Sequence, residues 1–257
     1  MPDGTIATPI SSRAWYSATI HEFLQSDADA ILGRLTSNCD FPVLPSQRDA
    51  WLAQICSLKD CIEGLNGSLF FEFSIPRMGR RIDVVLLVGT VIFAIEFKVG
   101  ETDFGRSAID QVWDYALDLK NFHEASHDAS IVPILVATEA KSAPPVELLA
   151  DDDKIYRPIL ANSGDLRLIL DQACQAIEGS QIDSQQWASA PYHPTPTIIE
   201  AARALYAQHS VEAIARYDAG AKNLSITSSR IEHLVADARA RHRKAICFVT
   251  GVPGAGK

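Results

Sequence analysis

Residues 80–98 read RRIDVVLLVGTVIFAIEFK, in which two apolar runs rich in β-branched residues flank Gly89-Thr90. Glycine followed by another residue is typical of a two-residue type II′ turn, so this stretch predicts a β-hairpin. With Gly89 and Thr90 as the loop, Val88 faces Val91. Counting outward along the two strands then puts Asp83 directly across from Glu96.

The pairs between the turn and the two acids are apolar on both faces of the hairpin, which is typical of strands buried on both sides. Directly opposed side chains have Cβ atoms roughly 5 Å apart, and like charges at that spacing are destabilising. Glu96 shares its face with Lys98, because side chains alternate along a strand. A hard divalent cation with oxygen ligands would compensate the two acids, so the pattern predicts a metal site at Asp83 and Glu96.

The composition is that of an ordinary soluble globular protein, with 257 residues, 47% hydrophobic residues and room for one large or two small domains. A net charge of −9 argues against coating nucleic acid through bulk electrostatics, although an enzyme needs only a local basic patch. Five cysteines without a C-x-x-C pair indicate reduced thiols and a cytoplasmic location. No apolar run reaches ~18 residues, so we expect no membrane partner, and the N-terminus lacks a secretory signal.

Helical and strand patterns surround the hairpin and predict a mixed α/β core with helices on both sides of a sheet. We expect helices at 15–25, 27–35 (capped by Ser26), 46–64, 105–122 and 166–177, and strands at 69–75, 131–138 and 154–160. A Pro-, Ser- and His-rich stretch, 187–196, predicts a linker. Further helices are expected at 197–209, 210–217 and 228–243, and a last strand at 245–250.

The helix expected after the hairpin carries Gln111 and Tyr115 at i and i+4, hence on one face. Together with Asp83, Glu96 and Lys98, these residues resemble the PD-(D/E)XK nuclease superfamily, in particular RecB-like members with a Q-x-x-x-Y motif. The resemblance covers about residues 46–140 and implies a restriction-endonuclease-like fold that hydrolyses phosphodiester bonds in DNA.

The resemblance also implies roles for these residues. Asp83, Glu96 and the main-chain carbonyl of Phe97 would bind Mg²⁺ or Mn²⁺, and Lys98 would activate water or stabilise charge on the phosphate. Gln111 and Tyr115 would position the substrate and the lysine. Many RecB-like members also carry a glutamate on the helix before the first strand. No acid occupies that place here, and either Glu63 or Glu72 is the candidate substitute.

The last residues, Gly251-Val-Pro-Gly-Ala-Gly-Lys257, follow an apolar run and resemble the start of a P-loop. The expected phosphate-binding residues are Gly251, Gly254, Gly256 and Lys257. The Ser/Thr and the helix that would complete the loop are missing, so ATP is expected to bind only a longer protein.

With the nuclease-like block, this end resembles bacterial nuclease–helicase fusions with a Schlafen-like helicase. The expected organisation is a nuclease-like domain at 1–180, a linker and helical connector at 181–244, and a truncated P-loop ATPase at 245–257.

Two rival functions remain open at this point. A catalytically inactive nucleic-acid-binding module of a P-loop helicase would keep the fold without the chemistry. The run His123-Glu-Ala-Ser-His127 matches the H-E-x-x-H motif of zinc metalloproteases, with Glu147 as a conceivable third ligand. Against the protease, the run falls where the helix should end. Basic residues around the hairpin are candidate nucleic-acid contacts: Arg77, Arg80, Arg81 and Arg106. Arg81 is expected to face Lys98 in the hairpin register.

Overall fold

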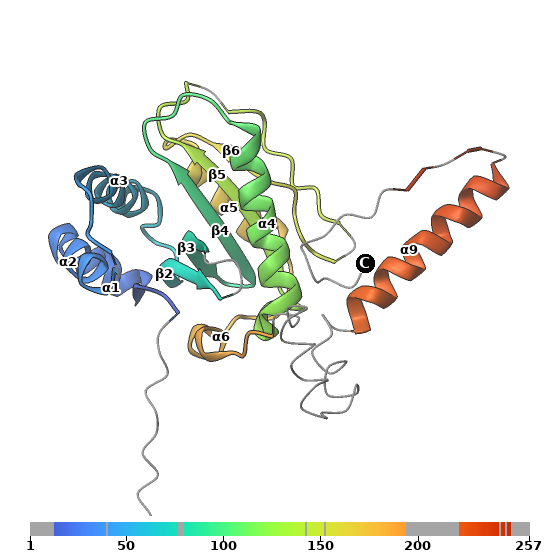
Figure 1. The fold of residues 1–257 in the computed structure, drawn as a ribbon, viewed down its shortest axis with the longest axis horizontal. Coiled ribbons are helices and arrows are strands. Elements are labelled where there is room, and N and C mark those ends of the chain that lie inside the picture. The colour runs from blue at the N-terminus through green and yellow to red at the C-terminus, as the bar shows by residue number, and fades with distance from the viewer. Residues whose placement is uncertain are drawn as a thin grey trace, which may run out of the picture.

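The computed structural model describes residues 13–39, 41–76, 80–141, 143–151, 153–193, 221–241, 243–244 and 246–247. It is an α/β fold built on a six-stranded mixed sheet flanked by helices (Figure 1). The strands are β1 (Tyr16–Thr19), β2 (Gly67–Ile75), β3 (Arg80–Val88), β4 (Val91–Lys98), β5 (Ser130–Ala137) and β6 (Ile159–Ala161). The helices are α1 (Ile20–Gln25), α2 (Ala28–Asn38), α3 (Pro45–Cys61), α4 (Arg106–Phe122), α5 (Leu166–Ala176), α6 (Ser184–Ser189) and α9 (Ala221–Ala240).

The strands lie in the sheet in the order in which they occur in the chain. Strands β1 to β4 pair antiparallel, whereas β4, β5 and β6 pair parallel. A parallel pair needs a long crossover connection, and α4 supplies it between β4 and β5. This crossover brings a helix directly after the hairpin back across the strands that carry the candidate site.

The predicted hairpin is confirmed near its turn. Val88 pairs with Val91, and the register continues without a shift to Val84 and Ile95. Gly89 has φ +59°, and Thr90 is not among the residues with positive φ, which agrees with a type II′ turn. The paired positions end at Val84 and Ile95, one step before the two acids, so the expected direct pair of Asp83 with Glu96 is not part of the ladder.

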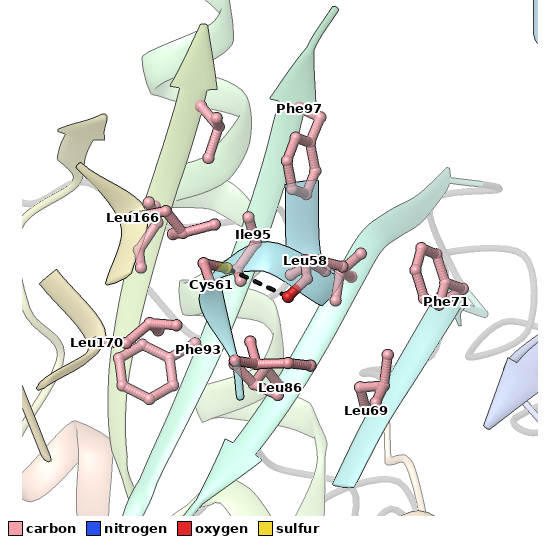
Figure 2. Close-up of a cluster of buried hydrophobic side chains, with 14 of the residues drawn as sticks. Leu58, Cys61, Leu69, Phe71, Leu86, Phe93, Ile95, Phe97, Leu166 and Leu170 are labelled. Atoms are coloured by element: carbon pink, nitrogen blue, oxygen red, sulfur yellow. Dashed lines mark hydrogen bonds between the residues drawn. The ribbon is translucent and has the colours of Figure 1, made fainter. Parts of the chain in front are cut away.

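The sheet is buried on both faces, as the apolar runs predicted. One face packs against α1, α2, α3 and α5, and Figure 2 shows Leu58 and Cys61 of α3 meeting strand residues such as Leu86 and Ile95. The opposite face, with Val85 and Ile92, packs against α4 and α6. In Figure 1, α1 to α3 gather on one side while α4 crosses in front of the strands. The two helical layers leave the ends of β2, β3 and β4 between them.

The N-terminal segment differs from the helix expected at 15–25. Tyr16–Thr19 instead forms β1, whose residues pair with the edge of β2 from Ser68 to Phe71. Only then does α1 begin, at a capping box in which Thr19 and Glu22 exchange hydrogen bonds. Four residues are too few to show a period, and the pairing partner lies about fifty residues away along the chain. The cap of α2 is Asp27, not Ser26.

Residues 182–193, expected as the start of a linker, belong to the folded core. Asp183 caps α6 through two backbone N–H groups, and Trp187 is 1% exposed. Its ring lies 5.0 Å from that of Phe73 and 4.5 Å from that of His123. This Pro-, Ser- and His-rich stretch thus includes a short helix that places one tryptophan in the core. The core therefore extends beyond the expected limit at residue 180.

Other predicted elements up to residue 181 agree with the structure to within a few residues, except that the predicted strand at 154–160 is reduced to isolated bridges and the short β6. Of the strand expected at 245–250, the structure describes only residues 246–247, which are not in a strand. Helix α9 covers most of the helix expected at 228–243. The helices expected at 197–209 and 210–217, and the P-loop residues Gly251, Gly254, Gly256 and Lys257, lie outside the described residues. Among the described helices, none has the length and apolarity needed to cross a membrane.

Candidate functional site

A cleft of about 830 Å³ lies beside β2 and β3, between α3 and α4. Its inner wall carries the side chains of Asp83 and Glu72, and its sides come from α3 and from the first half of α4. The loop 41–44 before α3 forms the outer wall. Residues separated by up to a hundred positions thus line one space: Trp15, Trp51, Glu72, Asp83, Gln111 and Tyr115, among others.

Four of the five predicted catalytic side chains form one hydrogen-bonded chain. The Lys98 ammonium donates to Glu96 Oε1 at 2.7 Å and to Gln111 Oε1 at 3.2 Å. The Gln111 amide donates in turn to Glu96 Oε1 at 2.8 Å and to the Tyr115 hydroxyl at 2.7 Å. Strand β4 and helix α4 therefore hold the lysine and the glutamate in a fixed relation, with Gln111 as the link.

Asp83, the fifth residue, joins this group through the backbone. Its Oδ2 accepts a hydrogen bond from the N–H of Phe97 at 2.9 Å, between Glu96 and Lys98 in the chain. Gln54 of α3 approaches the same oxygen at 3.4 Å. Beyond the last paired position of the ladder, β3 and β4 are thus linked by a hydrogen bond to the Asp83 side chain.

The electrostatics of the two acids agree with their crowding. Burial raises the pKa of Asp83 well above its usual range, and the nearby Glu96 carboxylate raises it further. Burial likewise raises the pKa of Glu96, while the Lys98 ammonium opposes that shift. Burial also raises the pKa of the Tyr115 hydroxyl, so this group stays protonated at neutral pH. The site is short of positive charge next to Asp83.

Glu72 is a third acid in this group, and it sits on a strained backbone. Its φ is +52° in the middle of β2, a conformation that costs a non-glycine residue about 1–3 kcal/mol. Trp51 Nε1 donates to Oε1 at 2.8 Å, and Arg81 Nε donates to Oε2 at 2.9 Å. The Arg81 guanidinium also lies 4.0 Å from the centre of the Trp15 ring. Both oxygens of Glu72 are therefore occupied by other side chains.

The structure shows which residues stand where RecB-like nucleases carry a glutamate on the helix before the first strand. Gln54 occupies the position on α3 that faces Asp83, and it is 4% exposed. Glu72 lies close enough to Asp83 and Glu96 to raise the pKa of both. Glu63 is exposed, and its backbone carbonyl accepts a hydrogen bond from Arg167. Of the two candidate substitutes, the structure brings only Glu72 to the cleft.

A divalent cation fits the donor atoms next to Asp83 and Glu96. Glu96 Oε2 is buried without a hydrogen-bond partner among the described residues, and so is Gln54 Oε1. Mg²⁺ prefers hard oxygen ligands and commonly takes one or two carboxylates together with water. No group of three or more His, Cys, Asp or Glu side chains placed to hold a metal occurs in the described part of the chain. The protein ligands would therefore be two carboxylates, assisted by main-chain oxygen.

The candidate nucleic-acid contacts fall into three groups. Arg80 and Arg81 line the cleft. Arg81 was expected to face Lys98. In the structure, Arg81 forms an ion pair with Glu72, and Lys98 forms a separate ion pair with Glu96. Arg106 is exposed at the start of α4, where it pairs with Asp110. Arg77 lies outside the described residues.

The residues of the H-E-x-x-H match do not form the helix that a zinc site of this kind needs. His123 ends α4, and a 3-10 turn, Glu124–Ser126, separates it from His127. The His123 ring is fully buried, and its Nδ1 lies 2.8 Å from Ser126 Oγ. Glu124 instead contacts His193. His123 is part of the core around Trp187, with 4.5 Å between the two ring centres.

Several cleft residues carried no motif in the sequence. Trp51 was predicted only as part of an apolar helix face, and Gln54 lies one turn further along that face. Trp15, Phe41 and Leu44 gave no signal, because their position in the cleft depends on β1 and on the loop before α3. A lone acid between Phe71 and Phe73 was the one local hint at Glu72.

Compared with models of protein families, with curated proteins and with solved structures, the chain matches none of them. The fold is α/β, and the feature of the molecule that bears on function is the acid-lined cleft.

Proposed function

We propose that the cleft is the active site of a metal-dependent nuclease of the PD-(D/E)XK type, which hydrolyses phosphodiester bonds in DNA. The observation that carries the proposal is the chain Lys98–Glu96–Gln111–Tyr115 beside Asp83, with a buried Glu96 oxygen that has no hydrogen-bond partner in the described part of the chain. Three buried or half-buried charges at strand ends have a cost that a purely structural role leaves uncompensated.

In this proposal each side chain has a definite task. Asp83, Glu96 and the carbonyl of Phe97 would hold Mg²⁺ or Mn²⁺, which polarises the phosphoryl oxygen and acidifies a bound water. Lys98 places its ammonium where negative charge grows on the phosphate. Gln111 fixes the directions of Lys98 and Glu96, and Tyr115 fixes the amide of Gln111. The C-terminal residues would begin an ATP-dependent helicase domain, on which the chemistry of the cleft does not depend.

Cleavage tests the proposal directly. The full chain is incubated with linear and circular DNA, and with RNA, in the presence of Mn²⁺ or Mg²⁺. We expect Lys98→Ala and Glu96→Gln to lose at least about a hundredfold in rate, the scale for removing one preorganised charged group. The matched control is Leu168→Ala, an exposed residue of α5 away from the cleft. Equal cleavage by all variants would point to a contaminating nuclease and contradict the proposal.

Metal binding gives a second measurement that needs no cleavage. A ligand that binds only the folded state raises the melting temperature by mass action. Mg²⁺ or Mn²⁺ should therefore stabilise the parent chain, and this shift should vanish in Glu96→Gln but persist in Leu168→Ala. A metal-dependent shift without cleavage of any nucleic acid would favour the inactive nucleic-acid-binding module instead.

A further inference from the structure

The side chain of Arg81 is held in one orientation in the cleft by its contacts. Its Nε donates to Glu72, and its guanidinium plane lies over Trp15, which contacts Trp51 edge-on at 5.8 Å between ring centres. Among the described residues, its two terminal nitrogens have no hydrogen-bond partner. The side chain of such an arginine is already ordered, so it loses little conformational entropy on binding. Its free N–H groups are suited to bind a phosphate bidentately.

The outer wall of the same cleft is apolar and open. Phe41 is 71% exposed and Leu44 is 66% exposed, and Pro42 and Val43 lie between them. These side chains face a space that also contains Arg81 and Asp83, so a ligand with both an anionic and a flat apolar part would contact both walls. A nucleotide has this chemistry. An aromatic side chain can stack on a base of DNA or RNA when that base is unstacked from its neighbours and unpaired.

The bases of an intact duplex are paired and stacked inside it, and they do not present their faces to a side chain such as Phe41. A single strand exposes base faces and phosphates along one edge. Its phosphates would meet repulsion from Glu72, Asp83 and Glu96 unless a cation reduces the negative charge of the cleft. Binding should therefore require a divalent metal.

We infer that the cleft accepts a single nucleic-acid strand, with one phosphate on Arg81 and an unstacked base against Phe41 and Leu44. This inference rests on the proposed function and adds the substrate class, namely single-stranded segments or frayed ends. Glu72 and Trp15 are then positioning residues, which act through Arg81. Glu72 holds this placement by accepting from Arg81 Nε, and it does so on a left-handed backbone.

The experiment measures binding of Lys98→Ala, which is expected not to cleave, with Mg²⁺ present. Fluorescence anisotropy compares a labelled single-stranded oligonucleotide with its blunt duplex. We expect the single strand to bind at least about tenfold more tightly. Phe41→Ala, made in this background, should lose about tenfold for the single strand, the scale of one stacked base. Leu44→Ala should lose less, and Leu168→Ala, at another exposed position away from the cleft, should lose nothing.

The arginine is tested through the salt dependence of binding. Arg81→Lys keeps a cation for Glu72 but has no planar fork, so it should weaken binding of the single strand. Glu72→Gln should weaken it through a loosened Arg81. Arg81→Ala should reduce the slope of log affinity against log salt by about one. The exposed Arg157→Ala, remote from the cleft, should leave the slope unchanged.

Equal affinity for duplex and single strand, or Phe41→Ala behaving like Leu168→Ala, would overturn the inference. If duplex were then cleaved in a manner dependent on Lys98, the proposed function would stand without it. If no nucleic acid bound at any metal concentration, both would fall. Preferential, Phe41-dependent binding of single strands supports the inference even in the absence of measurable cleavage.

Discussion

At the scale of single residues, Asp83 is the side chain least suited to its surroundings. Burial and neighbouring Glu96 raise its pKa, so the folded protein without metal binds a proton more readily than the unfolded chain. The stability that belongs to the protonated acid is present below the ordinary pKa near 3.8 and is lost as pH rises toward the raised value. At neutral pH the ionised carboxylate then destabilises the fold.

Asp83→Asn should therefore raise stability while abolishing the proposed cleavage. The asparagine oxygen can still accept from the Phe97 N–H, and the like charge beside Glu96 is gone. We expect about 1 kcal/mol of added stability at pH 7, the scale of typical stabilising substitutions. Urea denaturation without metal checks this. The gain should shrink at acidic pH and on adding Mg²⁺, and a destabilised variant at pH 7 would contradict the argument.

His123 predicts a pH dependence of opposite sign. Burial lowers its pKa from 6.5 to about 3, so the unfolded chain takes up a proton first as pH falls. The stability of the neutral ring is complete above pH 6.5 and is lost on acidification, by about 2 kcal/mol at pH 5. His123→Phe should flatten the decline in unfolding free energy between pH 7 and 5. His21→Gln, at an exposed position of α1, should leave it unchanged.

Most of the candidate catalytic residues were predictable at this scale because each lies within one local pattern. Asp83, Glu96 and Lys98 follow from one hairpin, and Gln111 and Tyr115 follow from helical spacing. The neighbours that complete the cleft were not predictable in the same way. Trp15 lines the cleft, and Gln54 approaches Asp83, through contacts between distant segments that no local period encodes.

At the scale of elements, the tight turn between β3 and β4 depends on a left-handed residue. Gly89 has φ +59°, where a side chain costs about 1–2 kcal/mol, and no atom lies within 4 Å of the Cβ that alanine would add. Gly89→Ala should therefore destabilise the fold by backbone strain alone. Gly33→Ala, on the exposed side of α2 with equally open space, should stabilise it by about 0.5–1 kcal/mol.

Urea denaturation of both variants separates the two effects, because the same chemical change is expected to have opposite signs. Equal changes in unfolding free energy for the two variants would show that the positive φ of Gly89 does not make alanine unfavourable in the turn. The contrast also explains why the hairpin was predictable while β1 was not. Its turn and register are encoded within nineteen residues, whereas β1 exists only because an edge of β2 is there to pair with it.

At the scale of the whole molecule, α6 and the following turn close the core beside α4. Removing Trp187 should cost about 3–5 kcal/mol, the usual range for a buried tryptophan changed to alanine. A fragment ending at residue 180 should accordingly melt more than about 6 °C below one ending at residue 193. Differential scanning calorimetry of the two fragments checks this. Equal melting temperatures would restore the domain limit at 180.

The sheet has a spatial order identical to the order of its strands along the chain. Each new strand therefore adds to an open edge left by the one before, and no strand has to insert between two that are already paired. A chain that emerges from the ribosome N-terminus first meets its next partner as soon as that partner is made. The acids on β2, β3 and β4 come together early in this sequence. The glutamine and tyrosine of α4 follow directly along the chain, so the candidate catalytic group is complete before β5 and β6 are made.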